Sequence, residues 1–316
     1  MEWTNGMLHL LSAIAAKFAM LIGWIFSPSW LPPKDFELVR WLFVPGYGYG
    51  IVLVAMAILE FVIPQERRRW SRASLLSGTY LLLAGKMVVY VFVVTPLFRN
   101  AWVYLGLPSA HLDRTLPWPL YVLTSVLVLT FTDYWAHRGM HQIPGLWHIH
   151  KIHHSARNLN WTSIYHKHFL ELLLNQPLRL ITLLALGTDL VAPFGVVFMI
   201  VDVLSHSNIR LDLGRLTYLI STPQAHRIHH SINPKHYDTN FGNTVMIWDR
   251  LFGTFCYDPN SLPTEYGVDE DIPLSFWKQQ VMPLVWIAKD TSAALSRRLS
   301  VGPRAQMAAI DAPNRE

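Results

Sequence analysis

The chain of 316 residues has little charge and almost no cysteine. Asp, Glu, Lys and Arg make up 15% of the residues, against roughly 25% in a typical soluble domain. A freely soluble protein is therefore not expected. The single cysteine, Cys256, excludes a disulfide framework and any cysteine-based zinc or iron–sulfur site. No basic stripe interleaved with aromatic residues is present, so we expect no nucleic acid partner.

Apolar residues are abundant, at 52% of the chain. A membrane-spanning helix needs about 20 mainly apolar residues. Four runs fit this pattern, and two weaker ones follow them: Met7–Phe26, Gly46–Val62, Leu75–Phe98 and Pro119–Trp135, then Leu170–Leu186 and Leu190–Leu204. Gly187-Thr188-Asp189 predicts a tight turn between the weaker runs. The sequence thus predicts an all-α fold, an integral membrane helical bundle.

The orientation of this bundle follows from its basic residues. The segment Gln65–Arg72 carries four arginines and is expected on the cytoplasmic side. Alternation of the spans then brings His137 and His206 to the same side. We therefore expect a multi-pass protein, in the inner membrane if the source is bacterial, with a histidine-rich cap on its cytoplasmic face. The net charge of +5 fits a neighbouring anionic lipid surface.

Histidine is the most informative residue, since 13 of the 15 histidines lie between His137 and His236. Three clusters have helical spacings that place their members on one face. They are His137 and His141, then His150, His153 and His154, then His226, His229 and His230. Imidazole suits iron, zinc, copper and nickel. Eight histidines exceed the four ligands of one tetrahedral zinc, so the spacing predicts a shared site for two metal ions with open positions.

Other residues are candidates for completing this site. His168 and His206 are candidate additional ligands, while His148, His166 and His236 are weaker ones. Asp133 lies one turn before His137 and is expected to hold that ring by a hydrogen bond. Glu171 and Asn208 are further candidates for holding the ligands. Asp238 and Asn240 fit either that role or a turn.

These motifs together resemble the membrane-bound fatty acid hydroxylase/sterol desaturase superfamily. The matching segments are HRGMH (137–141), LWHIHKIHHS (146–155), NWTS with the following His and Glu (160–171), SHSN (205–208), HRIHHS (226–231) and NFGNTVMIWDRLFGTF (240–255). The resemblance implies a non-haem dimetal centre, normally iron, held by the eight clustered histidines. His168 and His206 also fall at family positions. Bacterial members often have Arg and Pro where His166 and Phe169 stand, which leaves the role of His166 open.

The resemblance implies use of O2 and two electrons on a lipid C–H bond of a sterol, fatty acyl chain or other lipid. Hydroxylation is the first hypothesis, and desaturation on the same site is the second. A zinc-dependent membrane hydrolase lacks the expected HExxH motif, and a metal transporter would need ligands across the bilayer midplane. The segment GYGYG (46–50) lies in an apolar run and does not fit a dinucleotide-binding loop. We therefore expect a separate reductase, ferredoxin or cytochrome as electron donor.

Four segments follow from this interpretation. Residues 1–118 are expected to form N-terminal transmembrane helices, and residues 119–260 the histidine-box catalytic region. Residues 261–300 are expected to form an amphipathic segment, and residues 301–316 a disordered tail.

Overall fold

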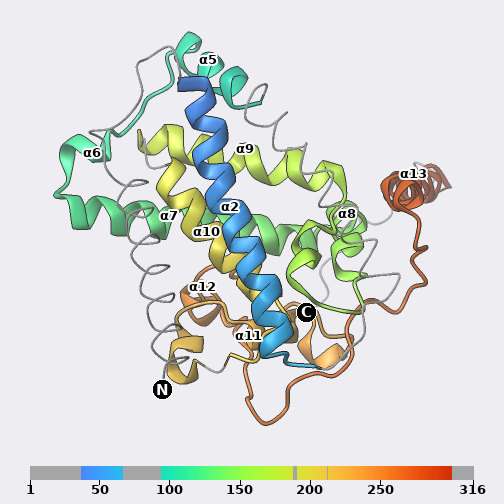
Figure 1. Ribbon diagram of the computed structural model, residues 1–316. Helices are drawn as coiled ribbons and strands as arrows, with labels where there is room; N and C mark the ends of the chain where they lie inside the picture. The colour runs from blue at the N-terminus through green and yellow to red at the C-terminus, as the bar shows by residue number, and fades with distance from the viewer. Residues whose placement is uncertain (1–36, 67–93, 188–190, 212, 301–316) are drawn as a thin grey trace, which may run out of the picture.

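Helices make up all the regular structure in the part of the chain that the computed structural model describes, residues 37–66, 94–187, 191–211 and 213–300 (Figure 1). Within these ranges, β-pairing is limited to isolated bridges such as that between Ile220 and Val245. The all-α prediction is confirmed for these residues.

Long helices cross the molecule as drawn in Figure 1. They are α2 (Glu37–Val62), α7 (Trp118–Gln142), α9 (Phe169–Leu186) and α10 (Val191–His206). Helices α7 and α9 pack together, and an ion pair between Arg179 and Asp133 joins them at 2.6 Å. Helix α2 lies along α10, where Met56 packs with Val203 and Ile209. The shorter helices α5 (Thr95–Tyr104) and α6 (Leu112–Thr115) lie at the periphery.

Shorter elements continue from the ends of these helices. They are α8 (Pro144–His154), η4 (Trp161–Tyr165), η5 (Gly214–Tyr218), α11 (Pro223–His229), η6 (Pro234–His236) and α12 (Ile247–Leu251). Ile143 is extended because it precedes a proline, so α7 ends there, and Pro144 occupies the first turn of α8. This sharp turn folds α8 back against the end of α7. The first two histidine clusters therefore meet.

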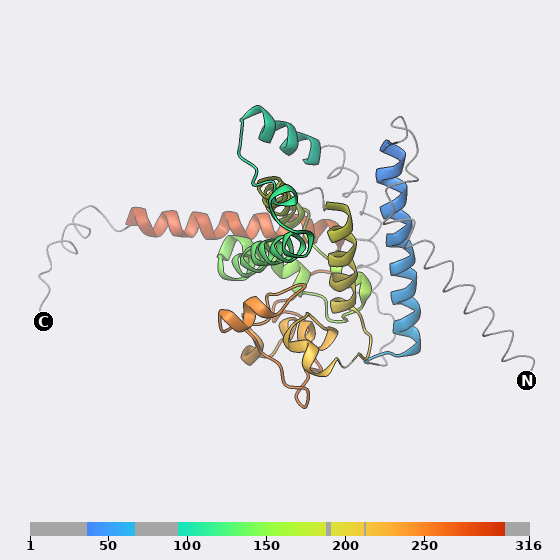
Figure 2. The same ribbon diagram turned by 90° about the vertical axis from the view of Figure 1, so that its left-hand side faces the viewer.

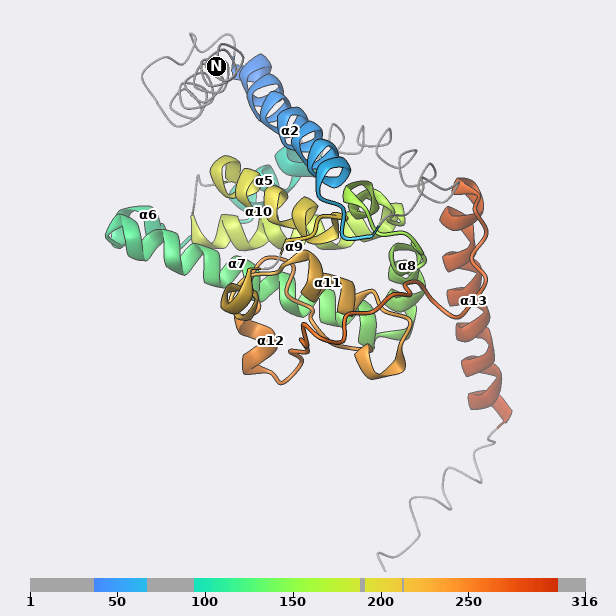
Figure 3. The ribbon, with the colours of Figure 1, turned by 60° about the horizontal axis from the view of Figure 1, so that its bottom comes forward.

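Helix α13 (Phe276–Ser300) runs along one edge of the molecule (Figures 2 and 3). Its first half packs on α8, where the ammonium group of Lys151 lies 3.8 Å from the ring centroid of Trp286. His148 Nε2 also lies 2.7 Å from the carboxylate of Asp290. Beyond this contact the helix extends away from the other elements.

Membrane-spanning capacity is shown for one helix among the described residues. Helix α9 has the length and apolar composition to cross a bilayer, and the apolar segment Gly50–Val62 is shorter. Gly187 ends α9 in the left-handed conformation at φ 66°, in agreement with the expected turn. Helices α7 and α10 cover the runs predicted there. The run Met7–Phe26 and most of Leu75–Phe98 lie outside the described residues, so multi-pass topology stays a prediction.

Candidate metal centre

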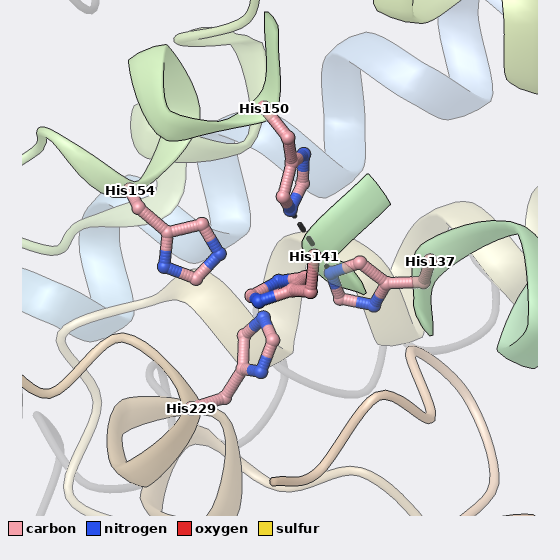
Figure 4. A group of neighbouring side chains, drawn as sticks. All are labelled: His137, His141, His150, His154 and His229. Atoms are coloured by element: carbon pink, nitrogen blue, oxygen red, sulfur yellow. Dashed lines mark hydrogen bonds between the residues drawn. The ribbon is translucent and has the colours of Figure 1, made fainter. Parts of the chain in front are cut away.

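Nine histidines form two adjacent groups. The five-histidine group contains His137, His141, His150, His154 and His229, and its rings converge on one point (Figure 4). The four-histidine group contains His153, His206, His226 and His230. Within each group the candidate ligand nitrogens all lie within 4.8 Å of one another. Two ligands on opposite sides of a metal lie about 4.2 Å apart, twice a bond of about 2.1 Å, so each group has the dimensions of one metal site.

The two HxxHH motifs each contribute to both groups. On α8, His150 and His154 join the five-histidine group and His153 joins the other. At α11 the pattern is reversed, because His226 and His230 join the four-histidine group and His229 the five-histidine group. The rings of His154 and His230 stack at 4.3 Å where the groups meet. The eight clustered histidines and His206 are therefore brought together as predicted.

Backbone carbonyls orient many of these rings. His137 Nδ1 donates to the Phe241 carbonyl and His229 Nδ1 donates to the Thr239 carbonyl, each at 2.7 Å. His206 Nδ1 donates to the Asp202 carbonyl at 2.8 Å, and His153 Nδ1 lies 3.3 Å from the His166 carbonyl. A carbonyl accepts only a proton, so each of these rings carries hydrogen on Nδ1. Nε2 is left with its lone pair toward the centre of the group.

The lone pairs at the centre fit a bound cation. His206 Nε2 lies 3.1 Å from His153 Nε2 and 2.9 Å from His226 Nε2. Since His206 and His153 both hold their protons on Nδ1, the first pair places two acceptors face to face. In the five-histidine group, the Nε2 atoms of His141, His154 and His229 are buried without a hydrogen-bond partner. Buried acceptors in such contact are costly unless a metal ion lies between them.

The protonation state of the rings suits ligation. Burial lowers the pKa of His229 to about 3, although its bond to the Thr239 carbonyl opposes this shift. Burial and the neighbouring imidazoles lower the pKa values of His153, His154, His226 and His230 well below 6.5. These imidazoles are therefore neutral at pH 7, the form that binds metals.

The loop 239–242 holds the carbonyls that orient the five-histidine group. Asp249 is fully buried, and its carboxylate accepts from the backbone N–H groups of Phe241 (2.7 Å) and Gly242 (2.8 Å). Asn240 is left-handed at φ 56°, and its amide nitrogen donates to the Ala225 and Cys256 carbonyls. Asn240 therefore acts on the rings only through the loop conformation.

Gly242→Ala is expected to displace this loop, because the new methyl group would collide with the Val245 carbonyl oxygen and meet the Asp249 carboxylate at 2.7 Å. We expect a loss of about 1–3 kcal/mol in the free energy of unfolding, together with weaker metal binding by the five-histidine group. Metal content after dialysis and thermal unfolding measure the two effects. Gly145→Ala is the control, since nothing lies within 4 Å of its added methyl. Equal behaviour of both variants would contradict the prediction.

Glu171, predicted to hold a ligand, lies against a ring of the five-histidine group. Its Oε2 is 3.1 Å from His150 Nδ1 and its Oε1 is 3.1 Å from Lys167 Nζ, and the side chain is 2% exposed. A carboxylate behind a ligating imidazole fixes the ring and increases its basicity.

Glu171→Gln is expected to weaken metal binding at the five-histidine group by about 10- to 100-fold, because the negative charge behind His150 is lost. Equilibrium dialysis against a graded series of metal buffers gives the affinity. Asp133→Asn is the matched control, since it also removes a buried charge but contacts Arg179 instead of a ligand. If both variants bind metal like the parent protein, the role of Glu171 is rejected.

Two sequence predictions, those for His168 and Asp133, differ from the structure. His168 joins neither group: its Nδ1 accepts from the Leu170 N–H at 3.1 Å and its Nε2 donates to the Gln280 carbonyl at 2.7 Å. Both ring nitrogens are therefore used, so His168 is not placed to bind metal. Asp133 contacts Arg179, not His137, whose Nδ1 is already bonded to a carbonyl.

Other candidates also lie outside the two groups. His166 Nε2 lies 2.8 Å from Gln279 Oε1 of α13, and His148 contacts Asp290. Asp238 Oδ1 lies 3.7 Å from His141 Nδ1, so this carboxylate is near a ligand as predicted. Asn208 contacts no candidate ligand; its Oδ1 accepts from the Glu66 N–H and from Arg227.

A buried network around Arg227 was not predicted. Arg227 is 1% exposed and donates to Glu66 Oε1 and Asn208 Oδ1, each at 3.1 Å. Glu66 also accepts from the Tyr266 hydroxyl at 2.6 Å. The position of Arg227 between His226 and His229 was the available signal, whereas Glu66 was interpreted only as part of a cytoplasmic arginine-rich segment. The network fixes the third histidine cluster to the segment after α2.

Comparisons with known proteins agree with this site. Residues 121–254 match the family model of the fatty acid hydroxylases. The chain is 33% identical over 170 residues to an ornithine lipid hydroxylase of Rhizobium tropici, covering 52% of this chain and 51% of that protein. It is 29% identical over 189 residues to an alkylglycerol monooxygenase of Xenopus tropicalis, covering 58% and 41%. The human alkylglycerol monooxygenase is 29% identical over 148 residues, covering 44% and 31%.

The matched segment contains all nine clustered histidines. These matches support the fatty acid hydroxylase superfamily for the segment 121–254. It spans about half the length of these curated relatives or less. No solved structure matched the chain.

Proposed function

We propose that this chain is a membrane-bound dimetal oxygenase that hydroxylates a C–H bond of a lipid. The observation that carries this proposal is the pair of adjacent groups of buried imidazoles, five and four in number, whose candidate ligand nitrogens lie within 4.8 Å of one another in each group. The names of the relatives, which are lipid hydroxylases and monooxygenases, support the lipid substrate and the reaction.

Iron is the metal we assign to each group. Imidazole is a suitable ligand for iron, and a monooxygenase needs a metal that changes oxidation state, which zinc does not. When bound, the metal pair supplies the O2 activation that side chains cannot. The overall reaction consumes a lipid C–H bond, O2, two electrons and two protons, and yields a lipid C–OH and water.

The residues of the chain hold and shield this centre. The nine imidazoles are the ligands, and the carbonyls of Thr239 and Phe241 with the Glu171 carboxylate fix their orientation. Phe241, with no exposed surface, packs against the rings of His137 and His141 and excludes water from one side. Rigid ligands in a site that excludes water fix the position of the metals relative to the reacting C–H bond.

The membrane and the electron donor complete the proposal. We propose a multi-pass topology in which α2 and α9 are among the spans, with the histidine groups on the cytoplasmic side. Exposed apolar side chains on both helices, such as Phe61 and Leu173, support contact with lipid. A separate reductase, ferredoxin or cytochrome supplies the electrons. The division at residues 118, 260 and 300 remains our proposal for the segments.

Metal analysis combined with O2-dependent lipid turnover tests the function. The purified full chain, reconstituted in vesicles of the host's lipids with a chemical reductant, is expected to contain two irons and to transfer one atom of isotopically labelled O2 into a lipid alcohol. Mass spectrometry of the extracted lipids reads the label. Unlabelled alkene formed only with O2 would favour desaturation, and zinc content with O2-independent turnover would favour a hydrolase.

A further inference from the structure

A cavity of about 380 Å³ lies next to the five-histidine group. Three members of that group, His141, His154 and His229, form part of its lining. Their side chains are almost completely buried, and their Nε2 atoms have no hydrogen-bond partner. A molecule in this cavity therefore contacts the candidate metal site itself. No residue of the four-histidine group lines it.

The remaining lining residues give this cavity a negative charge. Asp238, Asp269 and Glu270 line it, and among the described residues no lysine or arginine does so. Glu270 is neutralised by Lys151, whose ammonium group lies 3.0 Å away. In the described part of the chain, neither Asp238 nor Asp269 forms an ion pair with a lysine or arginine. The His141 ring lies 3.7 Å from Asp238, and the Tyr237 hydroxyl donates to Asp269 at 3.4 Å.

Trp147 adds an aromatic ring to the same lining. Its ring centroid lies 5.2 Å from that of His141 and 5.6 Å from that of His154, so it stands beside the candidate metal site. Carboxylates combined with an aromatic ring are the groups that bind an ammonium ion, by charge and by cation–π attraction.

We propose that this cavity binds the ammonium-bearing head group of the lipid substrate, with Asp238 and Asp269 as its counter-charges and Trp147 against it. This inference rests on the proposed function. The volume is near the lower end of ligand pockets, about 300–1,000 Å³, and suits a head group better than a whole lipid. Because the cavity reaches the five-histidine group, the hydroxylated carbon lies in or next to the head group.

The test uses the full chain loaded with cobalt(II), whose visible spectrum reports changes at the metal. Decylammonium and decanol serve as probes of one chain length and two charges. Decylammonium is expected to perturb the spectrum at the lower concentration. Asp269→Asn is expected to raise its dissociation constant about five- to tenfold, the effect of losing one partly exposed charge partner, and to leave decanol binding and cobalt content unchanged. Asp113→Asn, which alters an exposed aspartate of α6, is the matched control.

The outcomes separate this inference from the proposed function. Equal affinities for decylammonium and decanol, or an Asp269→Asn variant that binds decylammonium like the parent, would overturn the head-group assignment. Slower cobalt uptake by that variant without a change in decylammonium binding would also overturn it, in favour of a metal entry route. O2-dependent hydroxylation of neutral lipids alone rejects the head group and keeps the hydroxylase. Selective decylammonium binding without O2-dependent turnover of any lipid rejects the hydroxylase.

Discussion

His226→Ala is expected to reduce the metal content of the purified protein from two ions per chain toward one. Its Nε2 lies 2.9 Å from that of His206 and 3.1 Å from that of His230, so it is central to the four-histidine group. The variant leaves this group three imidazoles, while the five-histidine group keeps all its ligands. Lipid turnover needs both metals and should therefore fall about 100-fold or more. Losing a residue that only orients a ligand costs about 10- to 100-fold, and losing a ligand should cost at least as much.

Metal stoichiometry and labelled-product formation are measured on the same sample. His236→Ala is the matched control, since His236 lies near in sequence but belongs to neither group. It should retain two ions and parental turnover. Two ions with full turnover in His226→Ala would show that the four-histidine group is not a metal site.

Arg227→Met is expected to have the largest effect on stability. The guanidinium group donates to Glu66 and Asn208 and lies 3.3 Å from the Leu159 carbonyl. Its removal takes the Arg227 guanidinium away from the Glu66 carboxylate. Breaking a buried ion pair costs about 3–5 kcal/mol, which corresponds to a fall of roughly 10 °C in Tm for a chain of this size. Because Arg227 lies between His226 and His229, metal content should fall as well.

Thermal unfolding in detergent measures this effect. Arg250→Met is the control, because Arg250 is exposed and stacks over Tyr218 at 5.8 Å, a contact worth about 1 kcal/mol or less. Glu66→Gln combined with Arg227→Met should lose less than the sum of the two single variants, since both remove the same ion pair. Strict additivity would mean that the pair contributes no coupling energy.

The histidine clusters could be predicted from the sequence because their information is local. Helical spacing alone places His137 and His141 on one face, and the structure brings them to one group. Which histidine joins which group could not be predicted. That assignment depends on how α8 and α11 lie relative to each other, which is set by tertiary packing.

The failed predictions share one physical cause. His168 and Asp133 were placed near the metals by their distance along the chain, but each is bonded to a residue from a distant helix. The Gln280 carbonyl of α13 accepts from His168, and Arg179 of α9 pairs with Asp133. The carbonyls of Thr239 and Phe241 carry no side-chain signal, so no sequence pattern could identify them as the groups that orient His229 and His137.

The division of each HxxHH motif between the two groups has a consequence for which changes of length the chain can tolerate. Adding one residue to a helix rotates everything after it by about 100°. An insertion between His150 and His153 would separate the ligands of both groups at once, and so would one between His226 and His229. An insertion between His137 and His141 would separate ligands of the five-histidine group alone. These two short segments are therefore where a change of length is least tolerated, while the exposed outer half of α13 can lengthen freely.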